Sequence, residues 1–282
     1  MENVLAIEMY PKHKNRFVTF LSVSIIPILV VGFFYAAHKI ITTPSEQTVI
    51  NQQVAQFQEH NEWFEQVVFG NSPKGRAIEG YIIGEGERVL FLFGAIHGNE
   101  MGTADLLEQL VKEVQTSPSL LASGTQLVIV PIVNPDGYLD RVDKLNTNEV
   151  NLNLNFPTQD WKKYGDGGLF AGDEPFSEVE SRIIRDIVIH YRPEVMLSYH
   201  ARGALVSPEE GEESIALGKW YAEKTGYEYF DEWDYVGTAT RWFYEVLNQP
   251  AITIELSDYL ESDWDINKDA ILELIGSKEL PL

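Results

Sequence analysis

The chain has 282 residues, of which 44% are hydrophobic and 12% aromatic, enough for one sizeable globular core with residues to spare. Its formal net charge of −22 argues against nucleic acid as a partner, because a phosphate backbone would be repelled. Cysteine is absent, which excludes a disulfide framework and a thiolate metal site. His, Asp and Glu are therefore the metal ligands to look for.

The N-terminal part of the chain carries an apolar run. Residues 17–38 contain no Lys, Arg, Asp or Glu, and their length matches the hydrocarbon core of a bilayer. Residues 1–16 are polar and place three basic residues just before that run. We therefore predict a cytoplasmic tail (1–16) and a single transmembrane anchor (17–38) with the rest of the chain outside, because positive charge collects on the cytoplasmic side.

A cleavable signal peptide is the alternative for this run. Tyr35-Ala36-Ala37 resembles a small-residue cleavage site, but the run is longer than the usual apolar region of a signal peptide. An uncleaved anchor is therefore favoured. Residues 39–69 are rich in Gln, Asn and Glu and are predicted to form a polar stalk or a juxtamembrane helix.

From residue 70 onward, apolar runs alternate with helical patterns, which is typical of an α/β fold. Strands are predicted at about 77–84, 88–93, 126–133, 195–200 and 251–255. Helices are predicted around 106–114, from the capping box Ser177-Glu-Val-Glu180 to Pro193, at 212–225, at 240–248 and at 264–275. We expect one domain over 70–282 with a mixed, mostly parallel central sheet flanked by helices. Asn134-Pro-Asp-Gly137 is expected to be a turn.

Two of the six histidines lie at the carboxyl ends of predicted apolar strands. His97 and Glu100 belong to Gly94-Ala95-Ile96-His97-Gly98-Asn99-Glu100, directly after the 88–93 run, and His200 ends the 195–200 run. Open α/β sheets bind their ligands at this edge. Neutral imidazole and carboxylate are zinc ligands, and a catalytic zinc takes three protein ligands and a water. A His-x-x-Glu motif is weak alone, but His200 completes a candidate set of three.

Glu255 ends a third predicted strand in the same way, between Ile254 and Leu256. A carboxylate at the end of a buried strand is costly unless it is paired, near a metal or catalytic. Zinc would lower the pKa of its bound water to about 7, and Glu255 could take the proton and pass it to a leaving amine. A salt-bridged strand terminus is the structural alternative.

The order of six motifs resembles the zinc carboxypeptidase family of carboxypeptidase A. The motifs are Ser72-Pro-Lys-Gly75-Arg76-Ala-Ile78, His97-Gly-Asn-Glu100, Asn134-Pro-Asp-Gly137, Asn151-Leu-Asn153-Leu154-Asn155-Phe156-Pro157, Ser198-Tyr-His200 and Thr253-Ile-Glu255. The resemblance covers about residues 70–276. Within the family, residues 156–161, 174–178 and 237–242 resemble the bacterial murein tripeptide amidases, which cut the bond between γ-D-glutamate and the diamino acid of cell-wall peptides.

This resemblance implies a role for each matched residue. It implies that one zinc ion per chain is held by His97, Glu100 and His200, and that Glu255 is the general base and acid. Asn153 matches the asparagine that helps to hold the substrate's carboxylate. The family usually has arginine directly after that asparagine, whereas this chain has Leu154, so a bidentate carboxylate clamp is lost.

The resemblance also implies an upstream cation that polarises the scissile carbonyl. Arg141 is preferred for this role because of its fixed guanidinium geometry, and Lys144, which occupies the aligned position, is the substitute. Arg241 is a candidate replacement for the missing clamp, with a solvated helix-start charge as the alternative. Tyr235 is the candidate tyrosine that closes over substrate.

Together these observations predict a membrane-anchored zinc hydrolase with its catalytic domain outside. Its expected partners are a peptide substrate from the cell wall and the lipid bilayer through the N-terminal helix. The alternatives are a metallocarboxypeptidase acting on peptide C-termini and a deacylase of small N-acyl amino acids. From a different class comes a membrane-anchored protein that binds peptide or cell wall without cleaving it.

Overall fold

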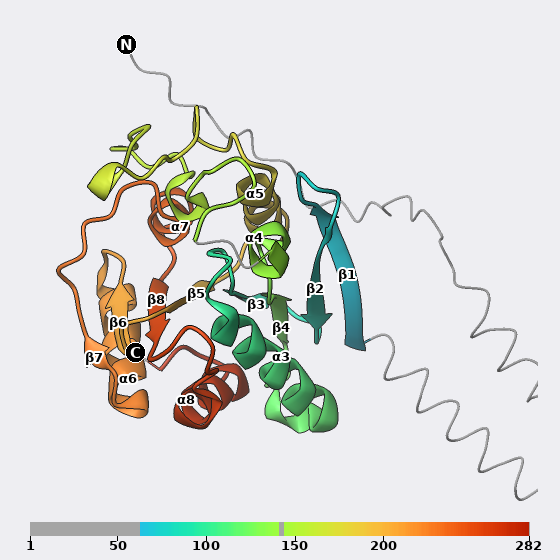
Figure 1. Cartoon of the computed structure of the whole chain (residues 1–282). Coiled ribbons are helices and arrows are strands. Elements are labelled where there is room, and N and C mark those ends of the chain that lie inside the picture. The colour runs from blue at the N-terminus through green and yellow to red at the C-terminus, as the bar shows by residue number, and fades with distance from the viewer. Residues whose placement is uncertain (1–62, 141–143, 282) are drawn as a thin grey trace, which may run out of the picture. The chain divides into compact units, whose positions relative to one another are not determined.

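The computed structural model describes residues 63–140 and 144–281 (Figure 1). The predicted cytoplasmic tail (1–16), the transmembrane anchor (17–38) and Arg141 lie outside the described residues. Within the described ranges, no helix is both long enough and apolar enough to cross a membrane.

The centre of the described part is a mixed, mostly parallel sheet, as predicted. Its eight strands lie in the order β1-β2-β4-β3-β5-β8-β6-β7. The strands are β1 (Phe64–Asn71), β2 (Ala77–Ile83), β3 (Arg88–Phe93), β4 (Thr125–Val130), β5 (Val195–Ala201), β6 (Leu205–Pro208), β7 (Glu228–Tyr229) and β8 (Ala251–Leu256). The pairs β4-β3, β3-β5, β5-β8 and β6-β7 are parallel, and β1-β2, β2-β4 and β8-β6 are antiparallel.

Helices cover both faces of this sheet (Figure 1). They are α3 (Met101–Thr116), α4 (Pro135–Asp140), α5 (Val179–Tyr191), α6 (Glu212–Thr225), α7 (Ala239–Leu247) and α8 (Trp264–Gly276). Side chains of α3, α6 and α8 form one apolar core with the sheet, and those of α5 and α7 form the other. The inner strands β3 and β5 are buried along their whole length, which explains their near-continuous apolar sequence.

Three local predictions are corrected by the structure. Residues 64–69, predicted as part of a polar stalk or helix, form most of the edge strand β1, all of whose positions are exposed or half-buried. The predicted turn at Asn134–Gly137 instead leads into the short helix α4. The capping box at Ser177 does not form, because the Glu178 backbone N–H donates to Asn155 Oδ1 (3.1 Å) and Glu178 is the N-cap of α5.

Candidate active site and metal centre

The predicted site residues meet at the carboxyl ends of three neighbouring strands. His200 lies on β5 and is the register partner of Glu255 on β8. His97 and Glu100 lie in the loop 94–100, between β3 and α3. Because β3, β5 and β8 are adjacent and parallel, their ends place these four side chains at one edge of the sheet.

The loop 94–100 is held in place by hydrogen bonds and by close packing. Thr103 Oγ1 accepts from the Ala95 backbone N–H (2.8 Å) and donates to the Glu100 carbonyl (2.7 Å). The backbone of Gly98 packs so closely on Gly137 that a Cβ atom at residue 98 would lie 2.3 Å from the Gly137 carbonyl carbon. Glycine at these two positions therefore allows the histidine-bearing loop to touch the segment after β4.

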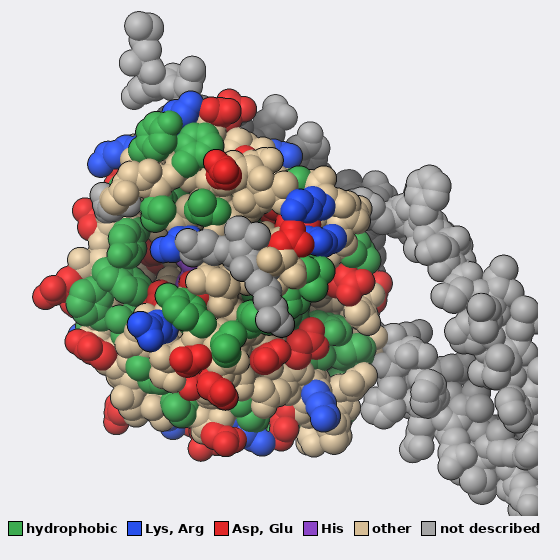
Figure 2. Space-filling model, viewed as in Figure 1, with side chains coloured by type: hydrophobic (Ala, Val, Ile, Leu, Met, Phe, Trp, Pro, Cys, Tyr) green, Lys and Arg blue, Asp and Glu red, His purple; other side chains and the backbone are tan. Residues whose placement is uncertain are grey.

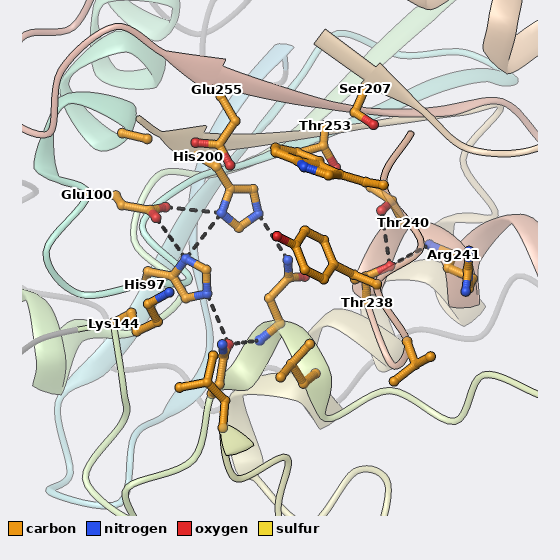
Figure 3. Close-up of a pocket in the computed structure, with 18 of the residues that line it drawn as sticks. His97, Glu100, Lys144, His200, Ser207, Thr238, Thr240, Arg241, Thr253 and Glu255 are labelled. Carbon is orange, nitrogen blue, oxygen red and sulfur yellow. Dashed lines mark hydrogen bonds and ion pairs between the residues drawn. The ribbon is translucent and has the colours of Figure 1, made fainter. Parts of the chain in front are cut away.

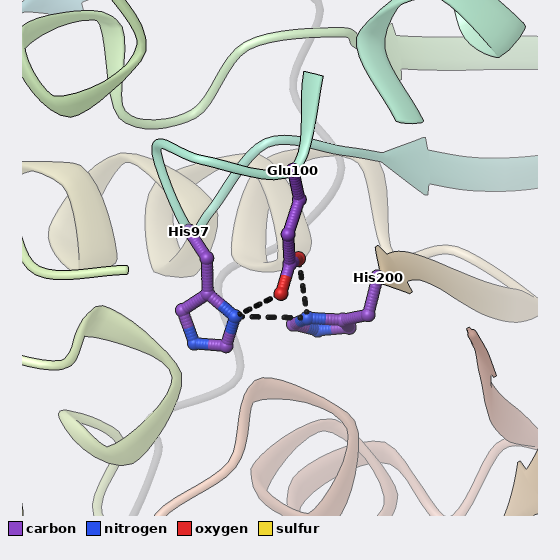
Figure 4. A group of neighbouring side chains, drawn as sticks. All are labelled: His97, Glu100 and His200. Atoms are coloured by element: carbon purple, nitrogen blue, oxygen red, sulfur yellow. Dashed lines mark hydrogen bonds and ion pairs between the residues drawn. The ribbon is translucent and has the colours of Figure 1, made fainter. Parts of the chain in front are cut away.

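His97, Glu100 and His200 form a compact, buried cluster (Figure 4). The two oxygens of Glu100 lie 2.8 Å from His97 Nδ1 and 3.1 Å from His200 Nδ1, and the two Nδ1 atoms are 3.3 Å apart. Their candidate ligand atoms all lie within 4.8 Å of one another, and this is the one such group among residues 63–140 and 144–281. Two imidazoles and a carboxylate thus face a common centre.

Electrostatics within the cluster oppose the effect of burial. Burial alone would raise the pKa of the Glu100 carboxyl, but the two neighbouring imidazoles outweigh it and lower that pKa to about 2. Burial disfavours charge on His200, yet the Glu100 carboxylate raises the pKa of that imidazole. Burial raises the pKa of the Glu255 carboxyl above its usual range. Glu255 is therefore a better proton acceptor than an exposed glutamate.

Asparagine side chains lie behind the two histidines, on the side away from Glu100. Asn151 Oδ1 lies 3.0 Å from His97 Nε2, and Asn153 Nδ2 lies 3.4 Å from His200 Nε2. An acceptor at His97 Nε2 fixes the tautomer that leaves Nδ1 free to bind a metal. Asn151 lies in the motif 151–157, but this role was not predicted for it.

A pocket of 540 Å³ opens in front of the cluster (Figure 3). The predicted residues Lys144, Asn153, Tyr235 and Arg241 line it together with the metal cluster and Glu255. Figure 2 shows histidine atoms inside a hollow, with hydrophobic side chains gathered beside it. Lys144 lies beside His97 in the same pocket, which places this cation at the metal end (Figure 3).

The pocket wall differs from the family pattern at the expected carboxylate clamp. Leu154 lines the pocket and is buried, so its position offers no charge. The guanidinium of Arg241 is already engaged: it lies 2.8 Å from Asp234, 3.2 Å from Asp160 and 3.9 Å from Glu209. Tyr235 is 44% exposed, with its ring packed beside Trp233 at a centroid distance of 5.4 Å.

Comparison with known proteins agrees with this geometry. Residues 50–215, more than half of the chain, match the family model described as zinc carboxypeptidase. The chain belongs to the zinc carboxypeptidase family. The resemblance found in the sequence motifs is therefore confirmed.

Two relatives and one solved structure show how far the similarity extends. Carboxypeptidase B of Astacus astacus is 27% identical over 162 residues, which are 48% of this chain and 54% of that protein. Murein peptide amidase A of Escherichia coli (strain K12) is 30% identical over 149 residues, 49% of this chain and 57% of that protein. The chain thus spans about half the length of these curated relatives. The carboxypeptidase A structure from Helicoverpa armigera has a TM-score of 0.65 at 20% identity, over 84% of this chain and 71% of that one, and shows the shared fold.

The residues of the cluster fit the zinc ion that this family implies. Catalytic zinc sites combine three nitrogen or carboxylate ligands with one open position, and two histidines with one glutamate form such a set. His97, Glu100 and His200 present those ligand atoms within 4.8 Å, and all three line the open pocket. The three residues predicted from the sequence as zinc ligands therefore lie together at one site in the structure.

Proposed function

We propose that the chain is a zinc-dependent peptidase that hydrolyses an amide bond in a cell-wall peptide. The observation that carries this proposal is the meeting of the candidate ligand set with Glu255 in one pocket of a zinc carboxypeptidase family member. A peptide substrate that binds in this pocket would place its amide group between Glu255 and the ligand cluster.

The chain's own residues supply the proton transfers and the charge balance of this reaction. Zinc held by His97, Glu100 and His200 would activate a water and polarise the amide carbonyl. The Glu255 carboxylate accepts a proton from the attacking water and delivers it to the leaving amine, which its raised pKa favours. Lys144, whose charge reaches the same end of the pocket, stabilises negative charge that develops on the carbonyl oxygen.

One observation favours a cell-wall peptide over an ordinary peptide C-terminus. Murein peptide amidase A of Escherichia coli is among the similar proteins, at 30% identity over the matched residues. Leu154 stands where the family usually has arginine, and the Arg241 guanidinium is shared by three carboxylates. A terminal carboxylate therefore finds a weaker partner here than a free arginine would provide, and because the murein peptide and an ordinary peptide both end in one, this feature does not separate the two substrates. The bond we propose is the one between γ-D-glutamate and the diamino acid.

We further propose that residues 17–38 anchor the chain in a membrane with its catalytic domain outside. The uncharged apolar run and the basic residues before it support this placement. Fractionation of cells that express the full chain, followed by protease treatment from outside, tests it. A soluble chain, or a protected catalytic domain, would overturn this part of the proposal.

The activity is tested by incubating the purified full-length chain with L-Ala-γ-D-Glu-diaminopimelate and with a panel of ordinary peptides, with and without a zinc chelator. Chelator-sensitive release of diaminopimelate is expected. Cleavage of ordinary C-termini alone would favour the second candidate, a metallocarboxypeptidase, which the similarity to carboxypeptidase B supports. Binding of the peptides without cleavage of any of them would favour the non-catalytic alternative.

A further inference from the structure

Arg202 is a cation in the pocket wall that the proposed mechanism does not use. Lysine and arginine line the pocket at Lys144, Arg202 and Arg241. The Arg241 guanidinium faces three carboxylates, and Lys144 lies at the metal end. Among residues 63–140 and 144–281, by contrast, no acidic side chain forms an ion pair or a hydrogen bond with Arg202. Arg202 is exposed, so its guanidinium can bind an anion that enters the pocket.

The Arg202 side chain is held at the pocket wall although it is exposed. Its guanidinium carbon lies 5.7 Å from the centroid of the Tyr259 ring, a cation–π arrangement. The Tyr259 carbonyl accepts a hydrogen bond from the Gly102 backbone N–H (2.8 Å), which ties it to the first turn of α3. The Gly203 backbone N–H donates to the Leu256 carbonyl at the end of β8 (2.9 Å). Both residues of the stack are thus fixed to elements that adjoin the metal site.

Strand register places Arg202 on one side of the reacting residues and the far end of the pocket on the other. β5 and β8 run parallel, with His200 opposite Glu255. Thr253 precedes Glu255 on β8 and lines the pocket, whereas Arg202 follows His200 just after the end of β5. Arg202 and Thr253 therefore lie on opposite sides of the His200–Glu255 pair, measured along the strands.

The two sides of the pocket differ in their exposure to solvent. At the far end, Ser207 is the register partner of Thr253, and both Ser207 and Thr240 are buried (Figure 3). On the other side, Tyr259 is 38% exposed and Arg202 is exposed as well. A terminal residue fits a closed end, whereas the rest of a peptide needs an open side. The diamino acid that the proposed reaction releases therefore occupies the far end, and the acyl part of the substrate lies beside Arg202.

A γ-glutamyl linkage places a carboxylate on this acyl side. Its amide is made with the side-chain carboxyl group of glutamate, so the α-carboxyl group stays free and is ionised at neutral pH. In an α-linked peptide the α-carboxyl group is itself part of the amide and carries no charge. A guanidinium binds a carboxylate through two parallel hydrogen bonds and gains much less from an uncharged amide.

We propose that Arg202 is a specificity-determining residue that binds the free α-carboxylate of a γ-linked residue on the acyl side of the scissile amide. This inference rests on the proposed peptidase function and adds the group that the pocket recognises on that side. The substrate class is then narrowed to γ-glutamyl peptides whose α-carboxyl group is ionised. A peptide with the same linkage but a carboxamide in this place is a poorer substrate.

The experiment compares two peptides that differ only in that group. One is L-Ala-γ-D-Glu-diaminopimelate. In the other, the α-carboxyl group of the glutamate is replaced by a carboxamide, which has nearly the same shape and no charge. Their kcat/KM values are measured on the full-length chain. The carboxylate peptide is expected to be preferred by about five- to tenfold, the size of a charge-assisted pair that stays partly exposed to water.

Arg202→Gln should reduce this preference to near unity by lowering kcat/KM for the carboxylate peptide. Each preference is a ratio measured within one protein, so a difference in the active fraction of the enzyme cancels. Arg192→Gln is the matched control, because Arg192 is also an exposed arginine but does not line the pocket. It should keep the full preference.

Equal kcat/KM values for the two peptides in the original chain would overturn the role of Arg202 and leave the peptidase proposal standing. A preference that survives Arg202→Gln, or an equal loss in Arg192→Gln, would do the same. If neither peptide is cleaved, the proposed function fails, and calorimetry on the original chain then decides the inference. Tighter binding of the carboxylate peptide that is lost in Arg202→Gln would support it, and equal affinities would overturn it.

Discussion

His200 and Glu255 are register partners on the adjacent parallel strands β5 and β8. The sheet itself therefore fixes the distance between a metal ligand and the candidate base, because a slip of one residue would turn one of the two side chains to the opposite face. His97 and Glu100 join them from a loop that packs on the segment after β4. The site thus depends on strand register on one side and on loop packing on the other.

Replacing Glu255 with Gln should abolish most of the activity and leave zinc in place. The carboxamide cannot accept the proton, so kcat is expected to fall by about 10²–10⁴-fold, whereas the ligand set His97, Glu100 and His200 is unchanged. Turnover of the peptide and zinc content by atomic absorption measure the two effects. Glu228→Gln, an exposed change on β7, is the control. An undiminished kcat in Glu255→Gln would exclude Glu255 as the base.

Asn151→Ala should weaken zinc binding, because it removes the acceptor 3.0 Å from His97 Nε2. Loss of such an outer partner typically lowers metal affinity by about 10–100-fold. Asn151→Asp keeps an acceptor oxygen and should restore or exceed the original affinity. The measurement is competition for zinc with a chromophoric chelator. Asn148→Ala, which removes a hydrogen bond to Glu178 instead, is the matched control; equal affinities in all of these proteins would contradict the role of Asn151.

Much of the metal cluster can be predicted from the sequence because the inner strands are continuous apolar runs. β3 and β5 are buried on both faces, so their residues are almost all apolar, and the histidines that follow or end them stand out. His200 was predicted as a strand end for that reason, Glu255 was predicted as the end of the apolar run 251–255, and the family resemblance supplied the role of each residue.

The far end of the pocket could not be predicted in this way. β6 has only four residues and pairs antiparallel with β8 after a reversal of the chain, so its sequence carries no clear period. Glu209 directly follows β6 and lines the pocket, where its Oε1 accepts a hydrogen bond from Thr240 Oγ1. Asn151 reaches His97 across 54 positions of sequence, a contact that depends on the path of the chain after α4.

Gly98→Ala should disturb the metal cluster through the backbone. The added methyl group would lie 2.3 Å from the Gly137 carbonyl carbon, which cannot move aside as a flexible side chain can. We expect a loss of about 1–3 kcal/mol in the free energy of unfolding, with weaker zinc binding because His97 shifts. Gly70→Ala is the matched control, since its methyl group would meet only the end of the Ile183 side chain. Unchanged zinc affinity in Gly98→Ala would show that the loop tolerates the shift.

Glu180 makes the stability of the fold depend on pH. It lies in the first turn of α5 with no exposed surface, and neither carboxylate oxygen has a hydrogen-bond partner. Burial raises the pKa of this carboxyl to about 7 from its ordinary value of 4.5. The folded chain therefore binds this proton more tightly than the unfolded chain does, and the free energy of unfolding should fall as the pH rises from about 4.5 through 7.

Glu180→Gln removes that dependence, because the carboxamide stays neutral at every pH. Its free energy of unfolding should equal that of the original chain near pH 4.5 and exceed it by on the order of 3 kcal/mol at pH 8, the value that corresponds to the shift in pKa. Urea unfolding of both proteins at the two pH values measures this difference, and the acidic measurement is the internal control. A constant difference between the proteins from pH 4.5 to 8 would mean that Glu180 does not titrate in this range.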